Sequence, residues 1–412
     1  MDTPSKESKT SGRWLTRGVF GIGLASLCSD WGHEIGTSLL PILLAGLGAP
    51  AYVLGIIEGV ADGVSSFAKL AGGWVADRPH LRKPVAVAGY LLTGLSTFAF
   101  GFVGTWPQVL ASRAIGWMGR GIRGPARDVL LTDAVAPELV GRAFGFERTM
   151  DTIGAILGPL CATALIAVMS VRMAMRWTLL PGALAALAIA TLVPTGIRDG
   201  EHHALPFTAS LSRLPREFRR FLKCVALFGL GDFAHTLLIF RAVQLLTPSY
   251  GIVRAGGIAV ALYTFHNVIY AAASYPAGLL GDKLGRRGVL VVGYLLAAVM
   301  SLGFIFATPR LPELIGLFGL AGFYVAIQDT LEKSVAAELL PREIRATGFG
   351  VLATVNGIGD FFSSIIVGFL WTAVSPAAGF IYAAALTAMG GLFLLFTVHG
   401  SSQQGSSQRQ RA

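Results

Sequence analysis

Long apolar runs alternate with short charged loops over almost the whole sequence. A transmembrane helix needs ~20 predominantly apolar residues, and twelve runs are of that order. Hydrophobic residues make up 53% of the chain and charged residues only 14%, whereas soluble domains carry about 25% charged residues. The sequence therefore predicts an all-α integral membrane protein with transmembrane helices at residues 18–46, 52–76, 85–103, 107–126, 143–169, 176–195, 222–246, 257–281, 288–307, 312–337, 344–372 and 376–397.

A polar, proline-containing stretch between Arg198 and Arg220 divides these helices into two sets of six. We therefore expect five parts along the chain. They are a cytoplasmic N-terminal tail (1–17), an N-terminal six-helix bundle (18–195), a cytoplasmic linker (196–221), a C-terminal six-helix bundle (222–397) and a disordered C-terminal tail (398–412).

Basic residues are concentrated in the loops on one side of the predicted helices. That side holds Arg78, Arg82, Lys83, Arg142, Arg213, Arg216, Arg219, Arg220, Lys223, Lys283, Arg286, Arg287, Arg342 and Arg345, and the other side holds little beyond Arg172, Arg176, Arg254 and Arg310. Cytoplasmic loops of membrane proteins carry this excess, so we expect a multi-pass protein of the cytoplasmic (inner) membrane with both termini cytoplasmic. The net charge of +10 then reflects topology and not nucleic-acid binding. We expect membrane lipids as its surroundings and a monomer.

A loop sequence occurs twice, once in each predicted bundle. The first copy runs from Gly73 to Lys83 (GWVADRPHLRK) and the second from Gly278 to Arg287 (GLLGDKLGRR), and similar apolar runs follow both, AGYLL and VGYLL. Duplication of a six-helix unit is the simplest account. The pattern resembles the loop 2–3 signature of the major facilitator superfamily (MFS). The second copy matches it fully, whereas the first replaces the inner glycine with His80-Leu81.

The resemblance implies two pseudo-twofold-related six-helix bundles that work by alternating access. An aspartate in this loop can cap a neighbouring helix and pair with arginines, which would latch the halves in one conformation. The alternative is that the basic residues only set the topology. The candidate latch residues are Gly73, Asp77, Arg78, Arg82, Lys83, Gly278, Asp282, Lys283, Arg286 and Arg287.

Two further segments resemble motifs of the superfamily. Arg113, in RAIGWMG, is similar to the helix-four arginine that is implicated in proton transfer in proton-coupled relatives. Gly154, Gly158 and Pro159, in GAILGP, resemble the Gly-Pro motif associated with antiporters, and thus with export. A Gly-Pro pair also kinks any helix and lets neighbouring helices approach, so a structural role is the alternative.

Ionisable residues within transmembrane helices usually mark the transport pathway. The first and seventh predicted helices both contain an aspartate followed three residues later by a histidine, Asp30–His33 and Asp232–His235. Residues at this spacing share a helix face, and the pseudo-twofold axis would place the two pairs on opposite walls of a central cavity. Other candidates for the substrate or proton site are Glu34, Glu58, Asp62, His266 and Asn267.

The two Asp–His pairs allow three interpretations. Asp30, His33, Asp232 and His235 could form an N2O2 site for Ni, Co, Fe(II), Zn or Mn, at which protons compete with the metal. The sequence is similar to a bacterial MFS branch that includes nickel-resistance exporters, although it lacks the His-rich C-terminal tail that some of them carry. The pairs could instead relay protons for an organic cation, drug or small metabolite, or they could be structural.

Asp128 and Asp329 suggest ion-pair networks near the cytoplasmic side, with substrate contact as the alternative. Glu147, Arg148 and Asp151 could pair with one another or gate the path, and Lys69 could pair with an acidic neighbour or snorkel. No phosphate-binding loop and no HExxH zinc motif occurs in the sequence, so we do not expect an enzyme. We predict a proton-coupled exporter that is driven by the proton gradient and needs no permanently bound cofactor. Its substrate is a divalent transition-metal ion or, alternatively, an organic cation, drug or small metabolite.

Overall fold

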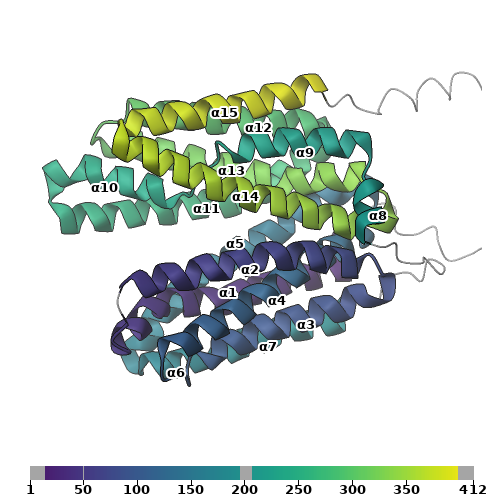
Figure 1. The fold of residues 1–412 in the computed structure, drawn as a ribbon, viewed down its shortest axis with the longest axis horizontal. Coiled ribbons are helices and arrows are strands. Elements are labelled where there is room, and N and C mark those ends of the chain that lie inside the picture. The colour runs from purple at the N-terminus through teal and green to yellow at the C-terminus, as the bar shows by residue number, and fades with distance from the viewer. Residues whose placement is uncertain (1–13, 50, 195–206, 398–412) are drawn as a thin grey trace, which may run out of the picture.

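The computed structural model describes residues 14–49, 51–194 and 207–397. These residues are almost entirely helical (Figure 1). The helices are α1 (Arg17–Gly46), α2 (Ala51–Ala76), α3 (Pro79–Ala99), α4 (Trp106–Asp133), α5 (Val140–Val168), α6 (Val171–Arg176), α7 (Leu179–Leu192), α8 (Phe207–Ser212), α9 (Arg216–Gly229), α10 (Thr236–Tyr250), α11 (Ile252–Leu284), α12 (Arg286–Ile305), α13 (Leu311–Leu339), α14 (Arg345–Ala373) and α15 (Pro376–Thr397).

The helices form two bundles, the N-terminal half (α1–α7) and the C-terminal half (α9–α15). In Figure 1 the N-terminal half lies below the C-terminal half. Each half contains six spans, because α6 and α7 follow one another in one span and α9 and α10 do so in another. Seven of the described helices are long and apolar enough to cross a membrane by length and composition alone. The predicted all-α fold of twelve spans is confirmed.

The helix of the seventh span begins before the predicted transmembrane segment. The sequence predicts this helix from residue 222, but α9 begins at Arg216, and the short helix α8 precedes it within the predicted linker. The first turns of α9 are amphipathic: Phe218 and Phe221 are fully buried, while Arg219 and Arg220 are exposed. A search for continuous apolar runs cannot detect such a turn. The predicted tails at 1–13 and 398–412, and the linker residues 196–206, lie outside the described residues.

The seventh span is interrupted between α9 and α10, where a continuous helix was predicted. Gly229 and Gly231 have low helix propensity, and Gly231 lies so close to α15 that a Cβ there would be 2.8 Å from the Ala383 carbonyl oxygen. The buried Phe233 packs edge-on against Phe380 of α15, with ring centroids 5.8 Å apart. These contacts stabilise the interruption, so Asp232 and His235 do not share a helix face as Asp30 and His33 do.

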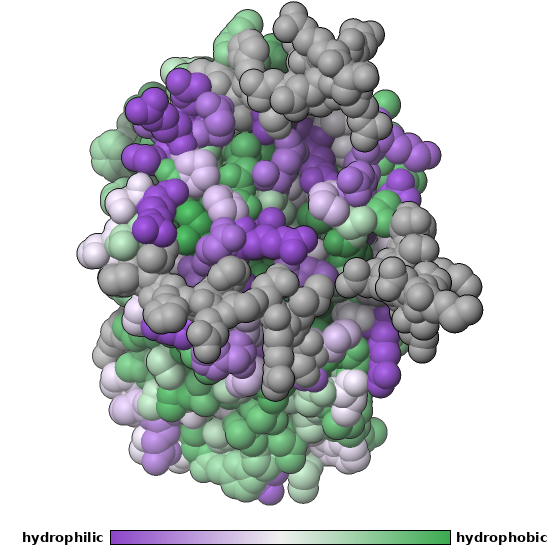
Figure 2. Space-filling model, turned by 90° about the vertical axis from the view of Figure 1, so that its right-hand side faces the viewer, coloured by the Kyte–Doolittle hydropathy of each residue, from purple (hydrophilic) through white to green (hydrophobic). Residues whose placement is uncertain are grey.

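The two halves meet at the end of the molecule that carries α8, which we call the connector end. Here the first turns of α5 and α14 lie against the last turns of α11 and α2. Gly141 and Gly278 permit the approach of α5 to α11, since a Cβ on Gly278 would lie 2.6 Å from the carbonyl carbon of Gly141. Figure 2 views this end and shows hydrophilic side chains gathered across it.

Trp14 also joins the two halves. Its ring lies 5.7 Å from Phe146 of α5 and 5.0 Å from Tyr275 of α11, centroid to centroid. A large aromatic side chain gains more from contacts of this kind than a polar tail residue would. Trp14 lies within the predicted tail, and α1 begins at Arg17, one residue before the predicted helix.

Candidate functional site

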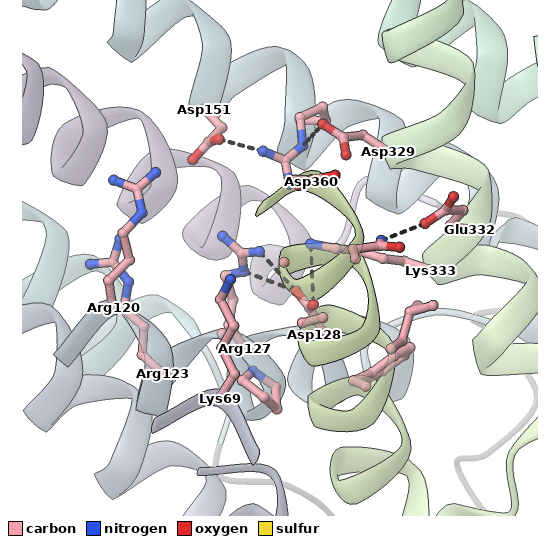
Figure 3. A pocket seen from close by; sticks show the side chains of 18 residues that line it. Lys69, Arg120, Arg123, Arg127, Asp128, Asp151, Asp329, Glu332, Lys333 and Asp360 are labelled. Carbon is pink, nitrogen blue, oxygen red and sulfur yellow. Dashed lines mark hydrogen bonds and ion pairs between the residues drawn. The ribbon is translucent and has the colours of Figure 1, made fainter. Parts of the chain in front are cut away.

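A cavity of about 250 Å³ lies between the two halves. The lining from the N-terminal half comes from α2, α4 and α5, and the lining from the C-terminal half comes from α13 and α14. Its charged residues, all labelled in Figure 3 except Arg148, are Lys69, Arg120, Arg123, Arg127, Asp128, Arg148 and Asp151 on one wall and Asp329, Glu332, Lys333 and Asp360 on the other. The N-terminal wall is therefore mostly basic and the C-terminal wall mostly acidic.

The basic wall is built around α4. Arg113, Arg120 and Arg127 recur every seven residues, which places them along one side of the helix. Arg120 pairs with Asp30 of α1 at 3.0 Å, and Arg127 pairs with Glu147 of α5 at 2.7 Å. Glu147 is fully buried, and a buried charge needs such a partner to be tolerated.

Two ion pairs cross between the halves at the cavity. Lys333 of α13 lies 3.2 Å from Asp128 of α4, and Arg148 of α5 lies 3.8 Å from Asp329 of α13. Arg148 is also paired with Asp151 at 2.6 Å. The sequence suggested ion-pair networks for Asp128 and Asp329 but not for Lys333, and the structure places these pairs between the two halves.

Other charges at the cavity have no ion-pair partner within the described part of the chain. On the basic wall, Lys69 has none, and Arg123 donates to Ser29 Oγ at 2.7 Å and lies over the Tyr90 ring at 4.0 Å. On the acidic wall, Asp360 has none, and Glu332 accepts hydrogen bonds only from neutral groups, Tyr294 at 2.5 Å and Asn356 at 2.7 Å. These four residues leave two basic groups on one wall and two carboxyl groups on the other, without a direct ion pair among the described residues, available to a ligand.

Asp30 and His33 lie on one face of α1 but contact different partners. Asp30 is paired with Arg120, whereas the His33 ring lies 4.6 Å from that of Trp117. Thr37 lies between His33 and the predicted helix-four arginine: it is 3.3 Å from His33 Nε2 and accepts from Arg113 at 3.2 Å. Arg113 and His33 thus belong to one polar cluster, which lies outside the cavity lining.

Asp232 and His235 are brought together by a third residue, Tyr324 of α13. The Tyr324 hydroxyl is 3.0 Å from Asp232 Oδ1 and 3.0 Å from His235 Nε2. His266 of α11 packs against His235, with ring centroids 5.0 Å apart. None of these four residues lines the cavity.

The remaining predicted site residues are spread over three helices. Asn267 is half-buried next to His266 on α11, Asp62 is exposed on α2, and Glu34 of α1 packs against Gly158 of α5. Glu58 lies on α2, but its side chain is outside the described set. Among the described residues, no group of three or more His, Cys, Asp or Glu side chains is placed to hold a metal ion. The four predicted metal ligands are engaged with other partners in this conformation.

Asp77 of the first loop copy caps a helix of the opposite half. Its Oδ1 accepts from the backbone N–H groups of Ala346 (2.9 Å) and Thr347 (3.2 Å) at the start of α14, and its Oδ2 accepts from the Thr347 hydroxyl. Burial raises the pKa of Asp77 to about 6, against the opposing effect of these hydrogen bonds. Arg82 pairs with Asp133 at 2.8 Å and not with Asp77.

Asp282 of the second loop copy makes the equivalent contacts to the N-terminal half. It accepts from the N–H groups of Gly141 and Arg142 at 2.9 Å each, at the start of α5. Arg286 pairs with Asp282 at 3.0 Å and also donates to the Pro137 carbonyl across the interface. Both loop aspartates therefore bind the positive end of a helix in the other half.

Other predicted latch residues have different surroundings. Arg78 lies over the Trp74 ring at 4.4 Å, and Lys83 donates to the Val193 carbonyl at 2.7 Å, beyond the end of α7. Arg287 pairs with Glu338 at 3.1 Å, and Lys283 is exposed. Gly73 lies against the Ala346 carbonyl, where a Cβ would be 2.5 Å from the oxygen.

The Gly-Pro segment of α5 forms a close helix contact. A Cβ at Gly154 would lie 3.0 Å from the backbone nitrogen of Trp31, and a Cβ at Gly158 would lie 3.1 Å from the Cα of Glu34. Both of these residues are on α1. Pro159 follows inside the unbroken helix α5. This packing matches the structural alternative for the motif.

Several charged residues of the cavity were not among the candidates from the sequence, among them Arg120, Glu332, Lys333 and Asp360. For Arg120 a signal existed, because an arginine every seven residues along α4 predicts a charged face inside the bundle. Glu332, Lys333 and Asp360 carried no comparable pattern. Their importance follows from the contact of α13 and α14 with the other half.

Comparison with known proteins agrees with this architecture. The profile of the Major Facilitator Superfamily matches residues 22–256 and 224–411. The chain is 30% identical over 398 residues to an uncharacterised MFS-type transporter of Methanocaldococcus jannaschii, covering 95% of this chain and 97% of that protein.

Two solved structures show the same fold at low sequence identity. The human organic anion transporter MFSD10 matches with a TM-score of 0.72 at 17% identity, over 92% of this chain and 99% of that one. The proton:xylose symporter XylE matches with a TM-score of 0.71 at 16% identity, over 93% and 96%. The chain belongs to the major facilitator superfamily and is a multi-pass secondary transporter.

Proposed function

We propose that this protein exchanges a small zwitterionic metabolite, with a carboxylate at one end and an amine at the other, against protons. The supporting observation is the arrangement of uncompensated charge in the cavity. Lys69 and Arg123 on the basic wall can bind a carboxylate, and Asp360 and Glu332 on the acidic wall can bind an amine. A divalent metal ion would be repelled by the positive charges of Lys69 and Arg123 on the basic wall.

The size of the cavity limits the substrate. The cavity has a volume of about 250 Å³. Drug-sized ligands occupy pockets of about 300–1,000 Å³. The cavity therefore favours a small metabolite over a drug.

Competition at the acidic wall supplies the coupling. A proton and a substrate amine both neutralise Asp360 or Glu332, so each lowers the affinity for the other. A carrier whose two ligands exclude one another performs exchange. With the proton gradient directed inward, this exchange is export.

The two capped loops define the state of the structure under this proposal. The basic loops favour a cytoplasmic position for the connector end, and the contacts of Asp77 and Asp282 would then close the cytoplasmic side. Opening of this interface would admit substrate from the cytoplasm, and reclosure would direct it outward.

The proposal is tested by ligand binding to the detergent-purified protein, followed as thermal stabilisation. The panel contains small amino acids, monocarboxylates, primary amines, Ni²⁺ and Co²⁺. We expect amino acids to stabilise the protein most, and Lys69→Gln and Asp360→Asn each to weaken this binding by about 10- to 150-fold, because a charge-assisted hydrogen bond contributes about 1.5–3 kcal/mol. Lys223→Gln, at an exposed lysine of α9, is the control. Stabilisation by the metal ions alone would contradict the proposal.

A further inference from the structure

The interruption of the seventh span holds an arrangement that the cavity does not explain. Asp232, Tyr324 and His235 form a continuous hydrogen-bonded chain, with the tyrosine in the middle at 3.0 Å from each neighbour. Irregular backbone at membrane depth is tolerated where it is buried in protein or lines a cavity, and interrupted helices often mark ion sites in transporters. The Ser364 hydroxyl satisfies one freed backbone group by accepting from the Ala234 N–H at 3.0 Å.

A tyrosine hydroxyl has one proton, which fixes the direction of the chain. When Asp232 is ionised, Tyr324 donates to it and must accept from a protonated Nε2 of His235. Nδ1 of His235 has no hydrogen-bond partner among the described residues, so it is the position at which a proton can be added. The ring itself is held by His266, which stacks on Tyr263 at 5.4 Å and is 3% exposed.

We propose that Tyr324 conducts protons between His235 and Asp232, so that Asp232 is a proton-loading site separate from the cavity. This inference deepens the proton coupling proposed above and rests on it. A proton binds Nδ1 of His235 and makes the ring an imidazolium. The Nε2–H bond then breaks as that proton joins the Tyr324 oxygen, and the original Tyr324 O–H bond breaks as its proton joins Asp232 Oδ1. The result is a neutral histidine protonated at Nδ1, an intact tyrosine and a neutral aspartic acid.

The proton stored on Asp232 acts on the cavity through its charge. Asp232 is hydrogen-bonded to Tyr324 of α13, the helix that also carries Asp329 and Glu332 of the acidic wall. Neutralising Asp232 removes one negative charge near the acidic wall. The attraction of the acidic wall for a substrate amine is then weaker. The relay would thus convert protonation into substrate release.

The test follows Asp232 directly by infrared difference spectroscopy on the full-length protein in detergent, without substrate. A pH jump from about 8 to about 4 supplies protons to the buried His235 and allows Asp232 to become protonated. We expect the C=O stretch of a protonated carboxylic acid to appear, and Asp232→Asn to remove it. In Tyr324→Phe its appearance should slow by about 10²-fold or more, since a positioned proton-transfer group contributes 10²–10⁴-fold. Tyr263→Phe, which removes a neighbouring hydroxyl outside the chain, should leave the rate unchanged.

His235→Ala is a second test variant, because it leaves the Tyr324–Asp232 hydrogen bond in place. It should slow the protonation of Asp232 to the same degree as Tyr324→Phe. An unchanged rate in Tyr324→Phe or His235→Ala, or the absence of an Asp232 band in the wild type, would overturn the relay. Since no substrate is present, this result is independent of the proposed exchange. A working relay without proton-dependent amino-acid binding would reject the proposed function and retain Asp232 as a proton site.

Discussion

Gly278→Ala should open the connector end without disturbing either half. A Cβ at this position would lie 2.6 Å from the carbonyl carbon of Gly141 and against its oxygen, whereas carbon atoms pack best at about 3.5–4.0 Å. Helices α5 and α11 would therefore have to separate by about 1 Å. Overpacking of this kind costs about 1–3 kcal/mol, and only the closed interface bears the cost. We expect the open fraction to rise by about 5- to 150-fold.

The opening can be measured by the reaction of a cysteine in the cavity with a maleimide. Asn356→Cys places the thiol in the lining. Cys28 and Cys224 are buried, and Cys161 is replaced by serine to lower the background. The labelling rate should rise in Gly278→Ala and stay unchanged in Gly288→Ala, where a Cβ meets nothing within 4 Å. Equal rates in the two alanine variants would refute this account of the interface.

Three further changes test other contacts. Because the pKa of Asp77 is raised from 3.8 to about 6, the closed interface should be most stable in acid and lose up to about 3 kcal/mol as the pH rises from about 4 to about 6; labelling at the cavity should follow that profile, and Asp77→Asn should make it flat. Trp14→Ala removes a ring contact to each half, worth about 0.5–1.5 kcal/mol apiece, so labelling should accelerate about 5-fold or more; an unchanged rate would show that Trp14 does not hold the halves. Arg127→Met leaves Glu147 buried without its partner and should destabilise the protein by about 3–5 kcal/mol, against about 1 kcal/mol or less for the exposed Arg220→Met; thermal unfolding of both variants in detergent decides this, and equal midpoints would contradict it.

The architecture could be predicted from the sequence because apolar length, basic loops and the repeated loop signature are local patterns. The interruption of the seventh span could not, since it depends on the fit of Phe233 against Phe380 and of Gly231 against α15. Glycine pairs alone do not break a transmembrane helix. The break therefore becomes visible only when distant helices are in place.

The candidate site was predictable only in part. Asp232 and His235 were identified from the sequence, but the residue that joins them, Tyr324, lies about ninety positions away and belongs to no motif. The symmetric role of Asp30 and His33 was an inference from duplication. In the structure Arg120 forms an ion pair with Asp30, and no equivalent arginine pairs with Asp232 among the described residues.

The central claim is that substrate and protons exchange through the cavity between Lys69 and Asp360. It is tested most directly in proteoliposomes that are loaded with the amino acid selected by the binding panel and given an inward-directed proton gradient. The account predicts that the gradient accelerates efflux of the amino acid, that protons enter as the amino acid leaves, and that Lys69→Gln strongly reduces both. Efflux that ignores the gradient, or proton entry that Lys69→Gln leaves intact, would contradict it.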